Sequence, residues 1–245
     1  MRKFTADLHI HTCLSPCAEL DMTPRRIIEA SLVKGLDIIA LSDHNSAENT
    51  GVAVELARDR GITVLPAMEI TSAEEVHVLA LFSSVEKATA MQEIVYGSLQ
   101  EGVNDEEHFG YQLVVNERDE ILEFNKRLLI GATSLSLSSL VAAVRALGGI
   151  AVASHIDREF AGVIGQLGFI PEDVNFDALE ISYNTARERA QTRFSDYASL
   201  PWITSSDAHA LHDIGRRVTT LVLQAASFEE VALALKGYRE IHWSA

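Results

Sequence analysis

Two histidines near the amino terminus have the spacing of paired metal ligands. The stretch "TADLHIHTCLSPC" at residues 5–17 places His9 and His11 at the end of an apolar run, with Cys13 and Cys17 close behind. Because alternate side chains of a β-strand project to the same face, the two imidazoles are expected to lie side by side. A packed core gains little from two adjacent imidazoles, whereas a metal ion binds them readily.

The same residue types recur after other apolar runs. They are Asp43 and His44 after "DIIALS", Glu69 in "ITVLPAME", His155 after "GIAVAS", and Asp207 and His209 after "WITSS". One histidine after a strand is more often structural, but five strands that end in this way indicate a shared site. Imidazole and carboxylate are typical ligands of zinc, manganese and iron(II), and one tetrahedral ion needs only about four of them. We therefore expect two or three divalent ions (Zn, Mn or Fe).

The elements that would position these residues alternate between strands and helices. Strands are predicted over 4–9, 37–42, 63–69, 76–82, 150–154, 178–182, 202–206 and 218–223, and helices over 24–34, 49–60, 86–100, 137–147, 185–199 and 228–237. Thr23 and Ser136 are predicted helix N-caps. This alternation predicts an α/β fold, a single domain with a largely parallel sheet. The polar stretch at about 101–135 interrupts the pattern and is expected to form an insertion or lid.

Composition limits the classes of partner. The chain of 245 residues is 47% hydrophobic and 22% charged, enough apolar sequence for a sizeable core. Its two cysteines form no disulfide framework, and no apolar stretch is long enough for a membrane span, so we expect a cytoplasmic protein without a membrane partner. The net charge of −15 and the dispersed basic residues argue against long duplex nucleic acid as a partner, and they are compatible with a small anionic substrate held through bound cations. The sequence indicates no oligomeric state.

Five motifs in order resemble the polymerase and histidinol phosphatase (PHP) family. They are "DLHIHT" at 7–12, "SDHN" at 42–45, "MEI" at 68–70, "SHIDR" at 154–158 and "SDAH" at 206–209. The resemblance implies a distorted seven-stranded β/α (TIM-like) barrel with a di- or trinuclear metal centre. It also implies a metal-dependent phosphoric ester hydrolase that acts on a small phosphomonoester or nucleotide through metal-activated water. A nuclease or phosphodiesterase acting on short nucleic-acid ends, and a non-catalytic metal-binding module, remain alternatives.

The resemblance also implies a ligand set. A first ion would be held by His9, His11, Glu69 and Asp207, a second by Glu69, His77 and His155, and a third by His44 and His209. His77 begins its apolar run, so it reaches the site only if its strand turns back after "TSAEE"; otherwise it is a core or surface residue. Cys17 aligns best with an extra metal-binding histidine of relatives, and it is therefore predicted to complete the third ion's ligands. Asp21 and Glu19 are the alternatives for this role. Cys13 is expected to pack.

The remaining roles concern the substrate and the support of the ligands. Arg158 and Arg216 are predicted phosphate-binding residues, with a surface salt bridge as the alternative for Arg158. His209 or His44 is predicted to protonate the leaving oxygen. Asp43, and with it Asp7, would orient ligands or bond to the backbone.

Overall fold

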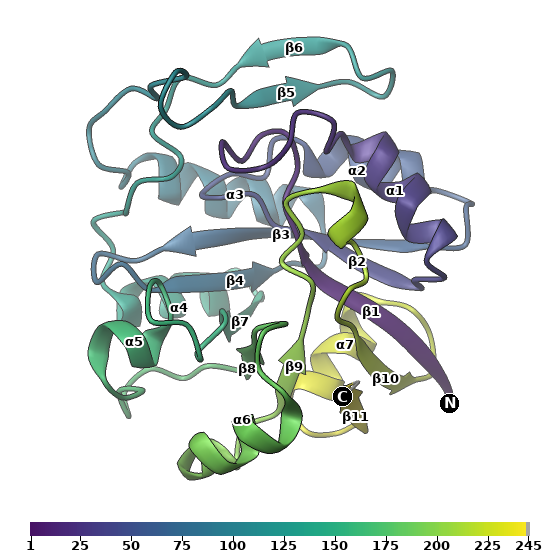
Figure 1. The fold of residues 1–245 in the computed structure, drawn as a ribbon, viewed down its shortest axis with the longest axis vertical. Coiled ribbons are helices and arrows are strands. Elements are labelled where there is room, and N and C mark those ends of the chain that lie inside the picture. Colours follow the sequence, from purple (N-terminus) through teal and green to yellow (C-terminus); the bar gives the residue numbers. More distant parts are fainter. Residues whose placement is uncertain (244–245) are drawn as a thin grey trace.

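A nine-stranded sheet forms the centre of the computed structural model, which describes residues 1–243 (Figure 1). The strands in spatial order are β11 (Ile241–Trp243), β10 (Thr219–Leu223), β1 (Arg2–Ile10), β2 (Ile38–Leu41), β3 (Thr63–Thr71), β4 (His77–Leu81), β7 (Ile150–Ala153), β8 (Ala178–Ile181) and β9 (Trp202–Thr204). The two ends of this order approach each other, since the Thr204 N–H of β9 donates to the Thr219 Oγ1 of β10 at 2.9 Å. The sheet is therefore a nearly closed barrel.

The strand directions differ from the expected parallel barrel. Of the eight strand pairs in this sheet, β1–β2, β2–β3, β7–β8 and β8–β9 are parallel, whereas β1–β10, β10–β11, β3–β4 and β4–β7 are antiparallel. The prediction of a largely parallel sheet was therefore wrong, and the count of seven strands is not confirmed. The physical reason is connection length, because the turn at 72–76 is too short for the crossover that a parallel neighbour of β3 requires. The α/β class is confirmed.

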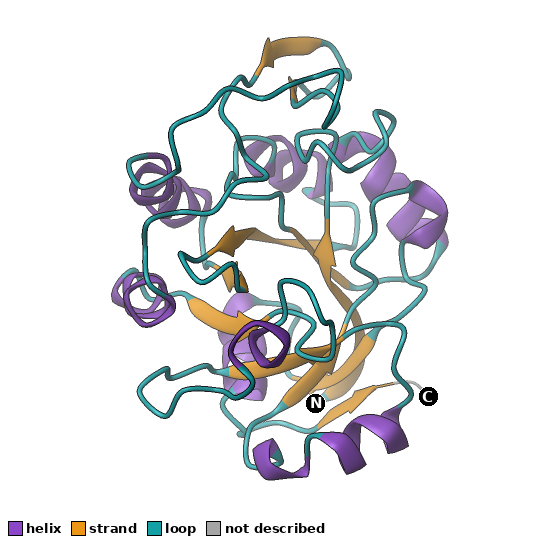
Figure 2. Cartoon of the chain, turned by 60° about the vertical axis from the view of Figure 1, so that its left-hand side comes forward, coloured by secondary structure: helices purple, strands orange, loops and turns teal. Residues whose placement is uncertain are grey.

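Helices surround the barrel (Figure 2). They are α1 (Pro24–Val33), α2 (Thr50–Ala57), α3 (Val85–Tyr96), α4 (Leu137–Ala146), α5 (Val163–Leu167), α6 (Arg187–Arg193) and α7 (Phe228–Leu235), with short 3₁₀ turns η1 (Ser195–Tyr197) and η2 (Leu211–Asp213). The predicted N-caps are confirmed, since Thr23 accepts a bond from the Arg26 N–H and Ser136 from the Ser139 N–H. The short helix α5 was not predicted.

The barrel interior is apolar and leads up to the predicted site. Every strand of the sheet contributes to one buried cluster that includes Leu8, Ala67, Leu79, Val152 and Ala178. Because side chains alternate along a strand, Glu69 and His77 extend the same inward face as Ala67 and Leu79. On β1 the pairing with β2 is irregular between Asp7 and Ile10, and such bulges redirect side chains. This irregularity lets both Leu8 and His9 face inward.

The segment 101–135 forms a separate layer. Its strands β5 (Leu113–Val115) and β6 (Ile121–Phe124) pair only with each other, beyond the loops that follow β1 and β2 (Figure 1). The Leu113 N–H donates to the Cys13 carbonyl at 2.8 Å, and Asn45 donates to the Leu129 and Gly131 carbonyls at 2.8 Å. The segment therefore rests on the loops of the site, and its function as a lid stays a prediction. No helix within residues 1–243 is long and apolar enough to cross a membrane.

Candidate metal centre

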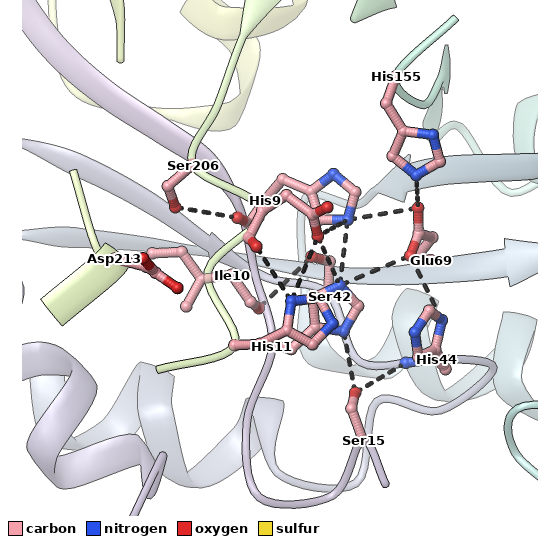
Figure 3. Close-up of polar contacts among 12 residues, drawn as sticks. His9, Ile10, His11, Ser15, Ser42, His44, Glu69, His155, Ser206 and Asp213 are labelled. Atoms are coloured by element: carbon pink, nitrogen blue, oxygen red, sulfur yellow. Dashed lines mark hydrogen bonds and ion pairs between the residues drawn. The ribbon is translucent and has the colours of Figure 1, made fainter. Parts of the chain in front are cut away.

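Four side chains, two from strands β1 and β3 and two from the loops that follow β1 and β9, form a compact donor cluster, of which Figure 3 labels His9, His11 and Glu69. The His9 Nε2 lies 3.2 Å from the His11 Nε2, 3.3 Å from Glu69 Oε1 and 3.5 Å from Asp207 Oδ1. The His11 Nε2 lies 3.2 Å from Asp207 Oδ1 and 3.5 Å from Glu69 Oε2. Two imidazole nitrogens and two carboxylates that approach one another this closely are a donor set typical of zinc and other divalent transition metals. These residues fit a metal ion.

Glu69 connects this cluster to a second group of histidines. Its Oε1 lies 3.1 Å from His77 Nδ1 and 3.1 Å from His155 Nε2, and its Oε2 lies 3.3 Å from His44 Nδ1. The antiparallel direction expected for the His77 strand is confirmed, with Thr71 opposite His77 in the β3–β4 ladder. One carboxylate therefore contacts both predicted ion positions.

A third donor group differs in composition from the expectation. The ring nitrogens of His11, His44 and His209 lie within 4.8 Å of one another, so His11 joins the predicted pair. Cys17 is exposed and belongs to none of the clusters of three or more donors among the described residues. Cys13 is buried against the Leu113 carbonyl, 3.7 Å from its Sγ, as expected for a packing residue.

Hydrogen bonds determine which ring nitrogen of several histidines faces the centre. The His11 Nδ1 lies 2.9 Å from Ser15 Oγ, and Ser15 donates in turn to Asp43 Oδ1 at 2.7 Å. His209 directs its Nδ1 to the Asp207 carbonyl at 3.0 Å. With the Nδ1 atoms protonated for these bonds, the Nε2 atoms of His11 and His209 are free to bind metal. Asp43 thus supports a ligand through Ser15, a residue that the sequence did not reveal.

Other buried nitrogens have no hydrogen-bond partner. The Nδ1 atoms of His44, His77 and His155 are inaccessible and unpaired, although those of His44 and His77 lie close to Glu69. Buried polar atoms are normally satisfied, so unpaired atoms need an explanation. For His44 and His77, a metal ion bound beside Glu69 would satisfy these atoms.

The pKa shifts of His11, His44 and Glu69 favour metal binding by these three residues. Burial lowers the pKa of His11 to about 4, with His209 acting in the same direction, and burial together with His11 lowers the pKa of His44 well below its usual value. Burial alone would raise the pKa of Glu69, but His77 and His9 hold it well below its usual range. Neutral imidazoles and an ionised carboxylate are the metal-binding forms. His9 differs: burial alone would lower its pKa, but Glu180, Glu69 and Asp207 raise it well above its usual value, so this ring must lose a proton to bind a metal ion.

The two predicted phosphate-binding arginines lie in different surroundings. The Arg158 Nη2 lies 2.5 Å from Asp207 Oδ2, on the side of that carboxylate away from the histidines, and its side chain is 32% exposed. Arg216 donates to the carbonyls of Ser206 and Asp207 and to Asp213 Oδ1, and it stacks on Tyr183. Arg158 is thus available to a ligand at the rim, whereas Arg216 mainly holds the loop that carries Asp207.

Two buried carboxylates complete the support of the site. Asp7 accepts from the Ser206 and Gly215 N–H groups at 2.9 Å, the backbone role that the sequence left open. Glu180 lies 3.0 Å from His9 Nδ1 and was not predicted. Its signal was a carboxylate within the apolar run "ALEI", at a strand position where only an inward-facing polar role explains it.

Comparison with known proteins agrees with the recognised motifs. A family model described as PHP-associated matches residues 184–237. The uncharacterized protein YqxK of Bacillus subtilis is 27% identical over 268 residues, which cover 97% of this chain and 63% of that protein. A two-domain protein of Bacteroides vulgatus containing a predicted PHP-like metal-dependent phosphoesterase superposes with a TM-score of 0.61 at 17% identity, over 99% of this chain and 64% of its own.

A higher structural similarity is to structures of Endonuclease Q. The lesion-specific endonuclease PfuEndoQ of Pyrococcus furiosus superposes with a TM-score of 0.77 at 19% identity, over 98% of this chain and 57% of its own. A second Endonuclease Q structure, at a TM-score of 0.76, contains a 27-mer duplex with an abasic lesion at the active site. This chain therefore spans less than two thirds of the length of these proteins and of YqxK.

The Endonuclease Q complex overturns one expectation from composition. The prediction that long duplex nucleic acid is excluded as a partner was wrong. A protein with this fold binds duplex DNA with a lesion at its active site. Net charge sums over the whole chain, whereas DNA contacts depend on local charge and on bound cations.

Proposed function

Because the chain is PHP-like, we propose that it is a metal-dependent phosphoester hydrolase. The observation that carries the proposal is the donor cluster of His9, His11, Glu69 and Asp207, with separations of 3.2–3.5 Å beside Arg158. Divalent ions held by these residues would activate water for attack and neutralise charge on the phosphate. We propose two or three such ions, with Zn, Mn and Fe as candidates.

The residues at the rim would bind and protonate the substrate. Arg158 keeps guanidinium N–H groups free beyond its pair with Asp207, and their planar arrangement suits two phosphate oxygens. If no third ion occupies the donor group of His11, His44 and His209, His209 is a better candidate than His44 for protonating the leaving oxygen, because its side chain is 31% exposed and that of His44 only 6%.

A cavity beside the centre would take the remainder of the substrate. It has a volume of about 320 Å³, includes His77, and is lined by residues 130–132 of the insertion and by Phe160. This size suits a small phosphomonoester or a nucleotide. Phe160 is 78% exposed at this place and offers an aromatic face for a base.

A second candidate is a nuclease that cleaves phosphodiesters in DNA. It is supported by the similarity to Endonuclease Q over 98% of this chain. The two candidates share the metal centre and differ only in the leaving group and in the surface that binds it.

The test is turnover by metal-loaded protein. Substrates would include phosphomonoesters, nucleotides, single-stranded oligonucleotides and duplexes with and without an abasic site, each with and without chelator. We expect chelation and His155→Ala to abolish turnover. Arg158→Ala should retain the metal and lower kcat/KM by about 10²-fold, in line with the loss of one transition-state donor.

Arg145→Ala is the matched control for the arginine variant. Arg145 also pairs with a carboxylate, Asp177 at 2.8 Å, but at the far end of β7 from His155. Its loss should leave kcat/KM unchanged. Absence of turnover on every substrate at full metal occupancy would instead favour a non-catalytic metal-binding module.

A further inference from the structure

Glu180 is a buried carboxylate that touches two of the proposed metal ligands. It lies on β8, is 1% exposed, and faces the barrel interior beneath the donor clusters. Its Oε2 lies 3.0 Å from the His9 Nδ1 and 3.1 Å from the backbone nitrogen of His155. The two contacts reach the first proposed ion position through His9 and the second through His155.

The contact with His9 determines which ring nitrogen is available. A carboxylate oxygen accepts from the Nδ1–H, so the Nε2 carries the lone pair. That Nε2 is the atom that lies 3.2–3.5 Å from the donor atoms of His11, Glu69 and Asp207. Within residues 1–243, Glu180 is the residue that the His9 Nδ1 contacts.

The contact with His155 stabilises an unusual backbone conformation. His155 has a φ of +28°, outside the region that residues with a Cβ normally adopt, and such conformations persist only where surrounding contacts hold them. Glu180 holds this turn twice, since its side chain accepts from the His155 N–H and its carbonyl accepts from the Ile156 N–H at 2.9 Å. The turn directs the His155 Nε2 to Glu69, 3.1 Å away.

The other oxygen of Glu180 has an unusual environment. Its Oε1 is inaccessible and has no hydrogen-bond partner. Burying an oxygen of a carboxylate without a partner is costly, and protein stability alone would favour an apolar residue at this position. Metal ions bound at the adjacent centre would offset the charge of this carboxylate and so compensate for the free-energy cost of its burial.

We propose that Glu180 is a positioning residue that links the two ion positions, by orienting His9 for the first and the His155 turn for the second. The inference rests on the proposed metal centre. It predicts that one substitution weakens both ions together, whereas loss of an individual ligand affects mainly its own ion.

The experiment compares Glu180→Gln and Glu180→Ala with Asp157→Asn. Asp157 is a matched control, because it accepts from the Ser182 N–H and from the hydroxyls of Ser182 and Thr185 in the turn after β8 but contacts none of the proposed ligands. Zinc dissociation constants would be measured by competition with a chromophoric chelator. Cobalt absorption spectra would report the ligand geometry, and circular dichroism would report folding.

We expect Glu180→Gln to weaken both tightest zinc sites by about 10- to 100-fold and to alter the cobalt spectrum, as for other carboxylates that orient ligating histidines. Glu180→Ala should weaken them further, and Asp157→Asn should change neither constant by more than about 3-fold. If Glu180→Ala fails to fold, Glu180→Gln decides, because it retains the volume and an acceptor for the His155 N–H.

Unchanged zinc affinity and spectrum in Glu180→Gln would overturn the inference, and so would weakening of one site alone. The outcome is separable from that of the proposed function. Wild-type protein that binds zinc without turnover would remove the phosphoesterase and leave the role of Glu180 intact. Wild-type protein that binds no zinc would remove both.

Discussion

The metal centre and the 101–135 segment lie next to each other but are built in opposite ways. At the centre, His9, His11, Glu69 and His155 are at most 2% exposed, and hydrogen bonds orient several rings from more than one loop. In the segment, strand β6 is exposed along its whole length, and β5–β6 pair only with each other. The comparison indicates a rigid metal centre beside a more weakly held segment, residues 101–135, which we call the wall.

The wall is nevertheless attached to the loops of the site as well as to the barrel, where the Thr133 N–H and hydroxyl donate to the Thr71 carbonyl of β3. Asn49 donates to Thr12 Oγ1 and to the Leu113 carbonyl, both at 2.9 Å, and accepts from the Val115 N–H at 3.1 Å. Thr12 directly follows the ligand His11 and bonds to Asp43 at 2.7 Å. A movement of the segment would therefore reach the loops that carry the ligands.

The largest expected effect is that of Glu69→Gln, which acts at the centre. Glu69 contacts the rings of five histidines, and its carboxylate lies directly between the first two clusters. We expect loss of at least one ion and a fall in kcat/KM of more than about 100-fold, the upper end for residues that merely support ligands. Elemental analysis and turnover would measure this, and full metal content in the variant would contradict the bridging position.

Sequence reasoning placed the proposed ligands at one end of the barrel because they follow simple rules, and the structure brings them together there, while their binding of metal stays a prediction. Side chains that follow inward-facing strand positions meet at one end of a barrel, and this holds for Glu69 and His155 without knowledge of the packing. The place of His77 beside Glu69 could be predicted on the condition that its strand turns back after the short turn at 72–76. The antiparallel β3–β4 pair meets this condition.

The features that the sequence could not predict depend on contacts between residues that are far apart in the sequence. Glu180 supports His9 from 171 positions away, and no local pattern encodes that pairing. The irregularity of β1 next to His9 and the positive φ of His155 are likewise products of tertiary packing. The strands β5, β6 and β11 are 3 or 4 residues long, too short to give a readable period.

An intermediate effect is expected from Asn49→Ala, at the boundary between the two regions. Asn49 is fully buried, and the substitution leaves the Leu113 carbonyl and the Val115 N–H without this partner. The free energy of unfolding should fall by about 1–3 kcal/mol, and proteolysis within 101–135 should accelerate. Urea unfolding and limited proteolysis would test this, with the exposed Asn175→Ala as a control that should change neither. Protection equal to that of wild type would show that the wall is held by other contacts.

A smaller effect is expected from Cys17→Ser. The sequence pattern had predicted a third-ion ligand here, but the residue is exposed and lies outside the donor group of His11, His44 and His209. We therefore expect unchanged metal stoichiometry and activity within about 2-fold, as for most surface substitutions. Loss of one ion, measured by elemental analysis, would restore the sequence-based assignment and require the loop at 12–22 to close over the centre.

The smallest effect is expected from Leu122→Thr, on the exposed strand β6. Leu122 is 65% exposed, and threonine keeps a high strand propensity, so the free energy of unfolding should change by no more than about 0.5 kcal/mol. Leu113→Thr on the paired strand β5 is the buried counterpart, because Leu113 is 7% exposed and packs with Cys13 and Val115. Its loss should cost about 2 kcal/mol or more, since a cavity or an unsatisfied hydroxyl would form there.

The pair of leucine variants decides whether the wall is as open in solution as its exposure indicates. If both variants lose stability equally, and the loss for Leu122→Thr grows with protein concentration, a second copy of the chain covers β6 and the contrast between the two regions fails. A loss confined to Leu113→Thr leaves β6 free, and metal content should then be unchanged in Leu122→Thr, because among the described strands β6 pairs only with β5, and β5 in turn contacts the ligand loops through Cys13 and Asn49.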